Sequence, residues 1–452
     1  MAASRERVVV VGGNAAGLTA ASRARRLDPR LDITVLERAS TVSSSTCGIP
    51  YFLAGDVSAE ALIRMTPADF QRERRIEVRT SIRVDEVLPS KRTVRGRRVD
   101  TGESLDFRFD RLLLATGVKP RLPDIPGTDL AGVFSILNLD DALRIKPTVD
   151  AIHKVGIVGA GYVGLEMAES LRRLGKHVTL YERRSSVLAA LDADMGRIVE
   201  YELGRHGVSV HTGQDVVALV GGDRGVTGIK TAGSLGVEPV DAVLLDTGVR
   251  PNVDLAAAAG IHIGESGGIA VNACMETNVP GVFAAGNCAE AFSLLHGRPV
   301  LEYLGTVAAK QGRIAGENLA GRRSRYAGTV GTTILKAFDL AIGKTGLTLE
   351  EAQQEGTPVV SARIEAPDRA AYYPGSRKIW VKLHASRENG RLIGMQAVGY
   401  GDVARRVDVA ATAITAGMSA GDLAGLDLAY TPPFGSLWDP IHVAAQAVLR
   451  KL

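Results

Sequence analysis

Cysteine is scarce in this 452-residue chain, which contains only Cys47, Cys274 and Cys288. Three cysteines do not make a disulfide framework, and their spacing matches no metal-ligand pattern, so we expect neither disulfides nor a metal site. No apolar run approaches the ~18 residues of a membrane span, and Met1 to Glu6 contain no signal-peptide core. The sequence therefore predicts a cytoplasmic protein with reduced thiols and no membrane partner.

A strong charge imbalance is also lacking. The formal net charge is +4 at pH 7, which is too small to predict a nucleic-acid partner, although arginines can still bind small anions locally. Glycine is frequent, with 51 residues, and apolar residues make up 45% of the chain, as is typical of an α/β protein. Because the chain is longer than a typical single domain, we expect roughly two to four domains.

A βαβ unit is the first motif that the sequence does contain. Val8 to Val11 form a β-branched run typical of a buried parallel strand, and the turn that follows contains Gly12, Asn14 and Gly17. A second strand, Ile33 to Leu36, ends at Glu37, where dinucleotide-binding folds place the carboxylate that binds a ribose hydroxyl. Asn14 replaces the second fingerprint glycine, so this motif alone leaves a packing role for the turn open.

A second βαβ unit repeats the pattern with an intact fingerprint. The strand Val155 to Val158 leads into a turn that includes Gly159, Gly161, Tyr162, Val163 and Gly164. These glycines allow a tight turn and the close approach of a pyrophosphate. Two such units predict two dinucleotides, a flavin and a nicotinamide. Glu182, at the end of the next strand, favours NADH over NADPH, while Arg183 and Arg184 keep NADPH open.

Three further segments support this organisation. The residues Ala115, Thr116 and Gly117 follow one apolar strand, and Gly286 and Asn287 follow another. From about Thr329 the pattern changes, because "KIWVKLHAS" and "GRLIGMQAVGYG" predict an antiparallel pair and "DVARRVDVAATAITAGM" predicts a helix. We therefore expect a separate C-terminal α+β domain that has no nucleotide signature.

This order of segments resembles the two-dinucleotide-binding-domain flavoprotein disulfide reductases over nearly the whole chain. The resemblance implies an α/β fold with two Rossmann-like domains, which bind FAD and NAD(P)H, and a C-terminal α+β dimerisation domain. It implies an FAD domain in residues 1–120 and 247–326, an NAD(P)H domain in 121–246 and a dimerisation domain in 327–452. It also implies a homodimer in which the C-terminal domain contributes to the active site of the other subunit.

The cysteine pattern narrows this resemblance. Most members carry two redox cysteines in the spacing C-x4-C, but here the fifth position after Cys47 is Phe52. The chain therefore resembles the single-cysteine branch: coenzyme A-disulfide reductases, persulfide reductases, NADH oxidases and peroxidases. The segment "STCGIPYFLAG" resembles the active-site turn of that branch, except that Ser44 and Thr46 stand where Phe and Asn are common. It implies that the Cys47 thiolate lies near the flavin and attacks a small disulfide or persulfide, such as coenzyme A disulfide.

Two other functions stay open. Oxidases and peroxidases of this branch usually have a histidine in the first glycine-rich turn, where this chain has Ala15. That difference argues against a dedicated peroxidase but leaves an NADH oxidase that cycles Cys47 through a sulfenate. The other alternative is an electron-transfer flavoprotein in which Cys47 is incidental.

The resemblance also assigns residues to the substrate. Residues that match the coenzyme A contacts of the family are Arg23, Arg26, Ser43 and Arg74; a solvated basic surface is the alternative for the arginines. Tyr372 and Tyr430 match tyrosines that reach the cysteine of the other subunit, where a phenol can protonate a leaving thiolate. Interface packing is the alternative for these tyrosines, and the role of His442 stays open.

The remaining assigned residues concern the cofactors. Tyr162 resembles a ring that covers the flavin until nicotinamide displaces it, and Glu166 is placed to touch the nicotinamide carboxamide. Asn287 replaces an aspartate that accepts a hydrogen bond from a ribityl hydroxyl, at a cost of ~1 kcal/mol. Arg38 and Gly248 complete the predicted cofactor-binding set.

Overall fold

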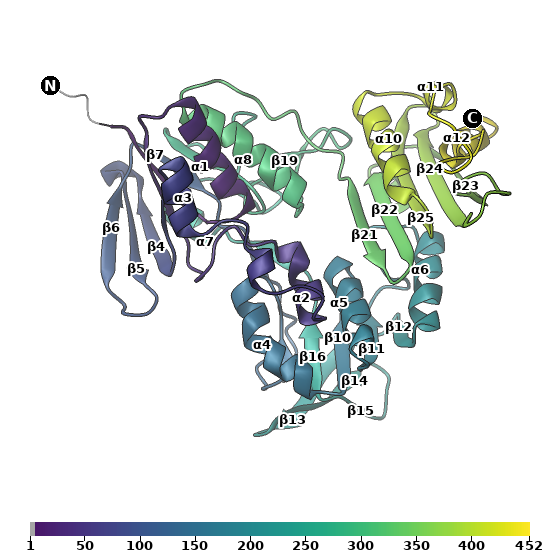
Figure 1. Cartoon of the computed structure of the whole chain (residues 1–452), viewed down its shortest axis with the longest axis horizontal. Coiled ribbons are helices and arrows are strands. Elements are labelled where there is room, and N and C mark those ends of the chain that lie inside the picture. The colour runs from purple at the N-terminus through teal and green to yellow at the C-terminus, as the bar shows by residue number, and fades with distance from the viewer. Residues whose placement is uncertain (1–4) are drawn as a thin grey trace.

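The structure is a computed structural model that describes residues 5–452, and three five-stranded sheets form its framework (Figure 1). The first sheet has the order β18-β7-β1-β2-β3 and is parallel throughout. Its strands are β1 (Arg7–Val11), β2 (Asp32–Leu36), β3 (Glu77–Arg79), β7 (Arg111–Leu114) and β18 (Val282–Ala284). The β-branched run of β1 is buried on both faces, and this confirms the expected first βαβ unit.

Helix α1 (Ala15–Leu27) connects β1 to β2 and packs along α8 (Gly305–Leu319). The two helices approach closely because small residues face each other. A Cβ added at Gly312 or Gly316 of α8 would come within 2.4 Å of a backbone oxygen of α1. This close contact fixes the start of α1, and with it the glycine-rich turn, over the end of the first sheet.

The second sheet has the order β12-β11-β10-β16-β9 and is also parallel. Its strands are β9 (Val133–Phe134), β10 (Lys154–Val158), β11 (His177–Glu182), β12 (Val208–Thr212) and β16 (Ala242–Leu245). The helices around it are α4 (Leu139–Ala151), α5 (Tyr162–Arg173) and α6 (Ala193–Arg205). An antiparallel sheet of β13 (Val216–Gly222), β14 (Gly225–Thr231) and β15 (Glu238–Pro239) packs beside it. The second βαβ unit is therefore confirmed.

The third sheet is antiparallel and has the order β21-β22-β25-β24-β23. Its strands are β21 (Thr333–Ala337), β22 (Leu340–Gly346), β23 (Val359–Pro367), β24 (Lys378–Ser386) and β25 (Leu392–Gly399). The helices of this part are α9 (Leu349–Gln354), α10 (Val403–Thr415), α11 (Ala420–Ala424) and α12 (Pro440–Leu449), with α10 to α12 in yellow in Figure 1. The pairing of β24 with β25 and the helix α10 confirm the α+β expectation for this region.

Shorter elements complete the chain. Beside the first sheet lie an antiparallel sheet of β4 (Ile82–Leu88), β5 (Thr93–Arg98) and β6 (Ser104–Arg108) and the helices α3 (Pro67–Arg74) and α7 (Asp254–Ala258), whereas α2 (Ile49–Leu53) packs against α4 and α5 of the second sheet. Single turns of 3-10 helix are η1 (Thr46–Gly48), η2 (Glu60–Leu62) and η3 (Pro89–Lys91), and a short pair is β19 (Ala291–Phe292) with β20 (Pro299–Val300). Within residues 5–452, no helix combines the length and apolarity needed to span a membrane.

The chain crosses between the first two sheets twice, and the crossings lie side by side. Strand β8 (Val118–Pro120) leaves the first sheet, and β17 (Val249–Pro251) returns to it in antiparallel pairing. The first sheet is consequently built from two separate stretches of sequence, while the exact domain limits at 120, 246 and 326 stay predictions.

Buried charges tie the second sheet to the third. Glu169 on α5 accepts hydrogen bonds from Lys336 Nζ (2.6 Å) and from Phe338 N (2.8 Å). Asp192, just before α6, forms an ion pair with Lys382 Nζ (2.7 Å) on β24. Glu169 and Asp192 are both buried. Lys382 is buried with Asp192, so removing one partner of that pair should cost about 3–5 kcal/mol. Lys336 is more than half exposed, and its pair with Glu169 contributes less. These pairs fix the position of α5 and α6 against the C-terminal sheet.

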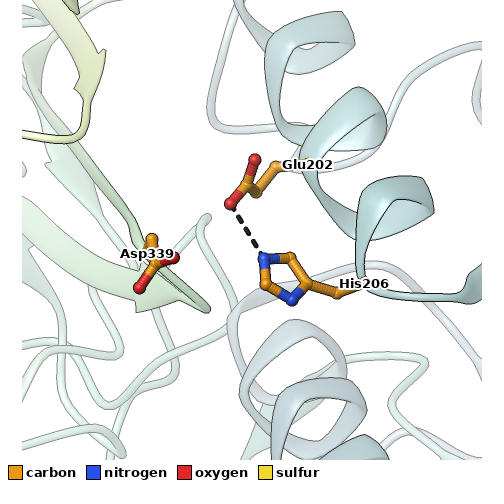
Figure 2. Close-up of side chains that lie close together, drawn as sticks. All are labelled: Glu202, His206 and Asp339. Atoms are coloured by element: carbon orange, nitrogen blue, oxygen red, sulfur yellow. Dashed lines mark hydrogen bonds and ion pairs between the residues drawn. The ribbon is translucent and has the colours of Figure 1, made fainter. Parts of the chain in front are cut away.

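A third tie lies at the end of α6, where Glu202, His206 and the hairpin residue Asp339 gather (Figure 2). Their oxygen and nitrogen atoms lie within 4.8 Å of one another, as the ligands of a cation would. Glu202, however, is fully buried and already bonds to His206 Nε2 (3.1 Å), Arg205 Nη1 (2.8 Å) and Tyr400 Oη (2.7 Å). Because the Arg205 guanidinium repels a second cation at this carboxylate, we interpret the cluster as a contact between domains.

Candidate active site

The first glycine-rich turn packs as closely as glycine permits. Gly12 has φ of 116°, and a Cβ on it would lie 2.1 Å from the carbonyl oxygen of Ala115 at the end of β7. The Glu37 carboxylate accepts hydrogen bonds from Gly13 N (2.7 Å) and Ala39 N (2.8 Å). A carboxylate has about four acceptor positions, so Glu37 retains capacity for ribose hydroxyls. Asn14 is exposed, and its side chain does not cap α1.

Beside this turn lies a buried oxygen atom that accepts no hydrogen bond from the described residues. Gly286 N donates to Gln311 Oε1 (2.8 Å), which fixes the segment after β18. The next residue is Asn287, whose buried Oδ1 has no hydrogen-bond partner among the described residues. Buried acceptors are rarely left unpaired in folded proteins. The orphaned oxygen beside the glycine-rich turn therefore fits a dinucleotide that carries donor hydroxyl groups, as the ribityl chain of FAD does.

Ala115, Thr116 and Gly117 follow β7 at the same edge of the sheet. Thr116 Oγ1 donates to Asn252 O (2.7 Å), and Asn252 N donates to Gly117 O (2.9 Å). These bonds hold the crossing between the first two sheets against the first glycine-rich turn. Arg38 follows β2, and Gly248, with φ of 92°, directly precedes β17. Their roles in cofactor binding stay predictions.

The loop that carries Cys47 is attached to the first glycine-rich turn. Ser43, in a left-handed conformation with φ of 53°, donates its N–H to Gly13 O (3.0 Å). Further along, Ser45 N donates to Leu62 O (2.8 Å), and a Cβ on Gly48 would lie 2.3 Å from the Leu62 side chain. Glycine at position 48 therefore lets η1 pack tightly and presents Cys47 at the surface. The dinucleotide turn and the cysteine loop thus form one unit.

The three cysteines differ in exposure. Cys47 is exposed, Cys274 is half-buried and Cys288 is buried. Burial raises the pKa of the Cys288 thiol, although hydrogen bonds with Thr116 and Gly117 oppose that effect. A buried thiol with a raised pKa is a poor nucleophile. Cys47 is therefore the cysteine that a small substrate can reach.

Tyr51 is a neighbour of Cys47 that the sequence analysis did not single out. It lies four residues after Cys47, on α2, which packs against α5. Burial raises the pKa of its hydroxyl, and the nearby Glu166, Glu169 and Cys47 raise it further. Tyr51 hence lies near both the cysteine loop and the acidic residues of α5. Its position four residues after Cys47 is the sequence feature that could have predicted this proximity.

The second glycine-rich turn repeats the geometry of the first. A Cβ on Gly159 would lie 2.0 Å from Asp246 O, and one on Gly164 would lie 2.3 Å from Gly159 O. Glu182 accepts hydrogen bonds from Ala160 N (2.9 Å) and Arg184 N (2.8 Å), much as Glu37 does in the first unit. Gly161 begins α5 as its N-cap residue. The turn has the geometry that a second dinucleotide requires.

Two acidic groups near this turn have raised pKa values. Burial raises the pKa of Asp246 to about 7, although its carboxylate accepts a hydrogen bond from Gly164 N (2.8 Å). Burial, with help from Glu169 and Asp246, raises the pKa of Glu166 to about 7. Asp246 was not predicted, because only the fold brings it beneath the glycine-rich turn. Raised carboxyl pKa values of this size are common at functional sites.

Tyr162 and Val163 occupy the first turn of α5. The Tyr162 hydroxyl shares a hydrogen bond with Thr333 Oγ1 (2.7 Å) on β21, and its ring lies against Leu188, Leu191 and Leu335. Val163 is exposed. In this conformation the Tyr162 ring contacts the C-terminal domain, and its role over the flavin stays a prediction.

The predicted substrate arginines differ in their present partners. Arg23 pairs with Glu317 Oε1 (2.6 Å) on α8, and Arg74 donates to Ser22 Oγ (2.6 Å). The pKa of Glu317 is lowered to about 2 by a hydrogen bond with Ser324 and by its contacts with Arg23 and Arg313. Arg26 is exposed and forms no ion pair with any described residue. Arg26 is therefore the free cation on this face of α1, while Arg23 is oriented by Glu317.

Tyr372 and Tyr430 come together in the C-terminal domain. Interaction with the neighbouring Tyr372 side chain raises the pKa of Tyr430. Both side chains are exposed, Tyr372 at 78% and Tyr430 at 44%. Three apolar residues that follow Tyr430 in the sequence are also exposed: Phe434 (69%), Leu437 (72%) and Trp438 (59%). Exposed apolar residues gathered in this way are typical of an interface between proteins. Figure 1 places α11 and α12, the two helices that flank the Tyr430 segment, well away from α2, which follows the Cys47 loop.

His442 differs from these neighbours because it is buried at the start of α12. Its two ring nitrogens find no hydrogen-bond partner in the described part of the chain, although Trp438 contacts the ring edge-on. The position beside the exposed apolar residues makes His442 part of the same surface region. Its role stays open.

Glu182 gives a direct prediction about coenzyme choice. Replacing Glu182 by alanine should lower kcat/KM for NADH relative to NADPH by roughly tenfold or more, because a hydrogen bond to a charged group contributes about 1.5–3 kcal/mol. Steady-state kinetics with both coenzymes measures the ratio. If the substitution also loosens the turn, kcat/KM falls equally for both coenzymes, and this effect cancels in the ratio.

Asp150→Ala is the matched control, since this exposed carboxylate belongs to the same part of the chain but pairs with Lys146 on α4. It should leave the NADH/NADPH ratio unchanged. An unchanged ratio in Glu182→Ala as well would show that Glu182 does not bind the ribose.

Comparisons with known proteins cover nearly the whole chain. The family described as "Pyridine nucleotide-disulphide oxidoreductase" matches residues 6–312, and its dimerisation domain matches residues 332–439. The NAD(P)H sulfur oxidoreductase (CoA-dependent) of Pyrococcus furiosus is 40% identical over 98% of this chain and 99% of its own length. The NADH oxidase of Methanocaldococcus jannaschii is 36% identical over 99% of both chains. The coenzyme A disulfide reductase of Staphylococcus aureus is 29% identical over 97% of this chain and 98% of its own.

A solved structure gives the same result. The NAD-dependent persulfide reductase from A. fulgidus matches with a TM-score of 0.95 at 38% identity, covering 98% of this chain and 83% of that chain. The fold, the order of domains and the sequence therefore agree from the first sheet to the last.

Proposed function

The chain belongs to the pyridine nucleotide-disulphide oxidoreductase family, and on that premise we propose that it reduces coenzyme A disulfide, or a related small persulfide, at Cys47. The family uses FAD and NAD(P)H, and the relatives include sulfur oxidoreductases, coenzyme A disulfide reductases and NADH oxidases. One observation carries the proposal: Cys47 is the exposed cysteine, and its loop is bonded to the glycine-rich turn of the first sheet.

The residues of both turns fit the two dinucleotides. Glu37 and the orphaned Asn287 Oδ1 would accept from hydroxyl groups of FAD on the first sheet, and Glu182 would accept from the ribose of NADH on the second. When bound, FAD supplies the two-electron chemistry that links NAD(P)H to the sulfur of Cys47. Glu182 favours NADH, and the exposed Arg183 and Arg184 leave NADPH usable.

Cys47 performs the sulfur chemistry. Its thiolate attacks one sulfur of the substrate, so that a Cys47–substrate disulfide forms while the substrate S–S bond breaks and a thiolate leaves. Two electrons from NAD(P)H and one proton then cleave the mixed disulfide, releasing the second thiol and restoring the Cys47 thiolate. For a persulfide the departing group is a thiol or sulfide, and the balance is the same.

A hydroxyl donor next to the sulfurs would speed this cycle. Tyr430, which lies beside Tyr372, is the group that we assign to protonate the leaving thiolate. Because α11 and α12, which flank the Tyr430 segment, lie well away from α2 in Figure 1, the two tyrosines would act on the cysteine of a second copy in a homodimer. The match to the dimerisation domain and the exposed Phe434, Leu437 and Trp438 support that assembly.

An NADH oxidase is the second candidate function, favoured by the relative from Methanocaldococcus jannaschii. In that reaction Cys47 would pass through a sulfenate. Ala15, exposed at the start of α1, provides no imidazole beside such a sulfenate. The first proposal is therefore preferred.

Removing the positive charges that are predicted to bind the phosphates of coenzyme A tests the substrate assignment. The double variant Arg23→Gln/Arg26→Gln should raise KM for coenzyme A disulfide by roughly 30-fold, because losing charge-assisted contacts to phosphate costs about 2 kcal/mol or more. KM and kcat for a small uncharged disulfide, measured with the same NADH assay, should stay near normal.

Arg30→Gln is the control, because Arg30 lies just after α1 and pairs only with Asp28. It removes a positive charge nearby without touching the predicted face. Equal losses on charged and uncharged disulfides in the double variant would instead assign Arg23 and Arg26 to folding. A wild-type enzyme that consumes oxygen far faster than any disulfide would favour the oxidase.

A further inference from the structure

Arg406, on α10, is a buried guanidinium with only 1% of its surface exposed. Its Nε and Nη2 donate to the two oxygens of the Asp439 carboxylate, at 3.1 and 2.9 Å. Nη2 also donates to Asp368 O (2.7 Å), and Nη1 donates to Asp402 O (2.6 Å). A guanidinium offers five N–H donors in a rigid planar fork, and here four bonds fix its orientation.

These bonds join the bases of two loops that are far apart in the sequence. Asp368 begins the loop between β23 and β24, which carries Tyr372, and Asp439 ends the segment between α11 and α12, which carries Tyr430. The Asp368 carboxylate accepts from Arg377 N (2.8 Å) and so closes the first loop on itself. Asp439 caps α12 through Ile441 N (3.1 Å) and so fixes the end of the second. One guanidinium therefore sets the distance between both loops.

The loops also touch directly. Ala370 N donates to Gly435 O (3.0 Å), and Arg405 Nη2 donates to Phe434 O (3.0 Å) and Asp439 Oδ2 (3.0 Å). Tyr372 and Tyr430 extend beyond these contacts with most of the Tyr372 side chain exposed. Since core packing does not hold the Tyr372 ring, the relative position of the two hydroxyls depends on the bonds at the loop bases.

We propose that Arg406 is a positioning residue that holds the loops of Tyr372 and Tyr430 together so that their paired hydroxyls meet the sulfur of the substrate. The proposal rests on the proposed function, in which Tyr430 serves as the proton donor. Arg406 touches neither substrate nor cofactor, and it acts through the tyrosines alone. A lysine cannot replace it, because a single ammonium does not reach Asp439 in bidentate fashion and Asp368 O at once.

The test is a double-mutant cycle that combines Arg406→Lys with Tyr430→Phe. Arg406→Lys should lower kcat for coenzyme A disulfide by about tenfold and leave flavin reduction by NADH unchanged, because only the second half-reaction uses the tyrosines. In the Tyr430→Phe background the same change should lower kcat by less than about twofold, since residues that act through one another are not additive. Arg363→Lys, which changes an exposed arginine of the same C-terminal sheet that pairs with Asp194 on α6, should leave kcat unchanged.

The outcomes separate the two proposals. Suppose that Tyr430→Phe slows turnover, but Arg406→Lys has the same effect on the wild type and on the Tyr430→Phe variant, or no effect on either. Arg406 then does not act through the tyrosine, and only this inference is overturned. If Tyr430→Phe is fully active, the proton-donor role in the proposed function fails, and the inference fails with it. Should Arg406→Lys not fold into an FAD-containing dimer, Asp439→Asn takes its place with the same expectations, because it keeps an oxygen to cap α12 while removing the charge that faces Arg406.

Discussion

Cys47→Ser should abolish the reduction of coenzyme A disulfide and small persulfides, with a loss of roughly 10³-fold or more, because the reaction loses its nucleophile. A serine hydroxyl is not ionised at neutral pH, and it forms no disulfide. NADH should still bleach the flavin absorbance of the variant at a normal rate, since the coenzyme site on the second sheet is untouched. Rapid-mixing absorbance and steady-state disulfide turnover measure the two quantities separately.

Cys274→Ser is the control for this prediction. Cys274 is half-buried, and its backbone N–H bonds to Asn272 Oδ1 (2.8 Å) in a turn far along the sequence from Cys47. Its substitution should leave disulfide turnover unchanged. If Cys47→Ser keeps full disulfide turnover, Cys47 is incidental and the proposed chemistry at this cysteine is overturned.

The parts of the fold that could be predicted from sequence depend on local rules. The strands around Val8 and Val155 and the turns after them were predictable, because buried parallel strands need continuous apolar runs and dinucleotide turns need glycine. The structure shows the reason for the second requirement: side chains at Gly12 and Gly159 would collide with Ala115 and Asp246. The pairing of β24 with β25 followed equally from alternating patterns and a glycine turn.

The features that could not be predicted depend on pairs distant in sequence. Arg23 was assigned to phosphate binding, and nothing in its neighbourhood indicated that Glu317, 294 positions away, holds its guanidinium. Asp246 reads as the end of an ordinary strand until β16 is placed beside β10, where burial raises its pKa to about 7. Arg406 likewise looks like one basic residue on an amphipathic helix, and only the folded loops show what it holds together.

Tyr430→Phe should slow disulfide turnover by about 10- to 1000-fold, around the range of a single acid catalyst. The thiolate that leaves during attack by Cys47 has a pKa near that of free cysteine, about 8.5, so a donor within hydrogen-bond reach assists its departure. A phenol keeps its proton at neutral pH because its ordinary pKa is about 10, and the neighbouring Tyr372 side chain raises the pKa of Tyr430 further. Flavin reduction by NADH should stay near normal, because that step needs only residues of the first and second sheets.

Mixed dimers decide which subunit the tyrosine serves. A heterodimer of one Tyr430→Phe chain and one Cys47→Ser chain contains one site with both Cys47 and Tyr430 if the tyrosine acts on the partner's Cys47. Such heterodimers, purified with two different tags, should therefore show about half of wild-type turnover, whereas each parent homodimer is nearly inactive. If the tyrosine serves the cysteine of its own chain, each site of the heterodimer lacks one of the two groups, and the mixture stays as slow as its parents. The separation of α2 from α11 and α12 in one chain (Figure 1) leads us to expect recovery, since Tyr430 then meets a cysteine only across the dimer.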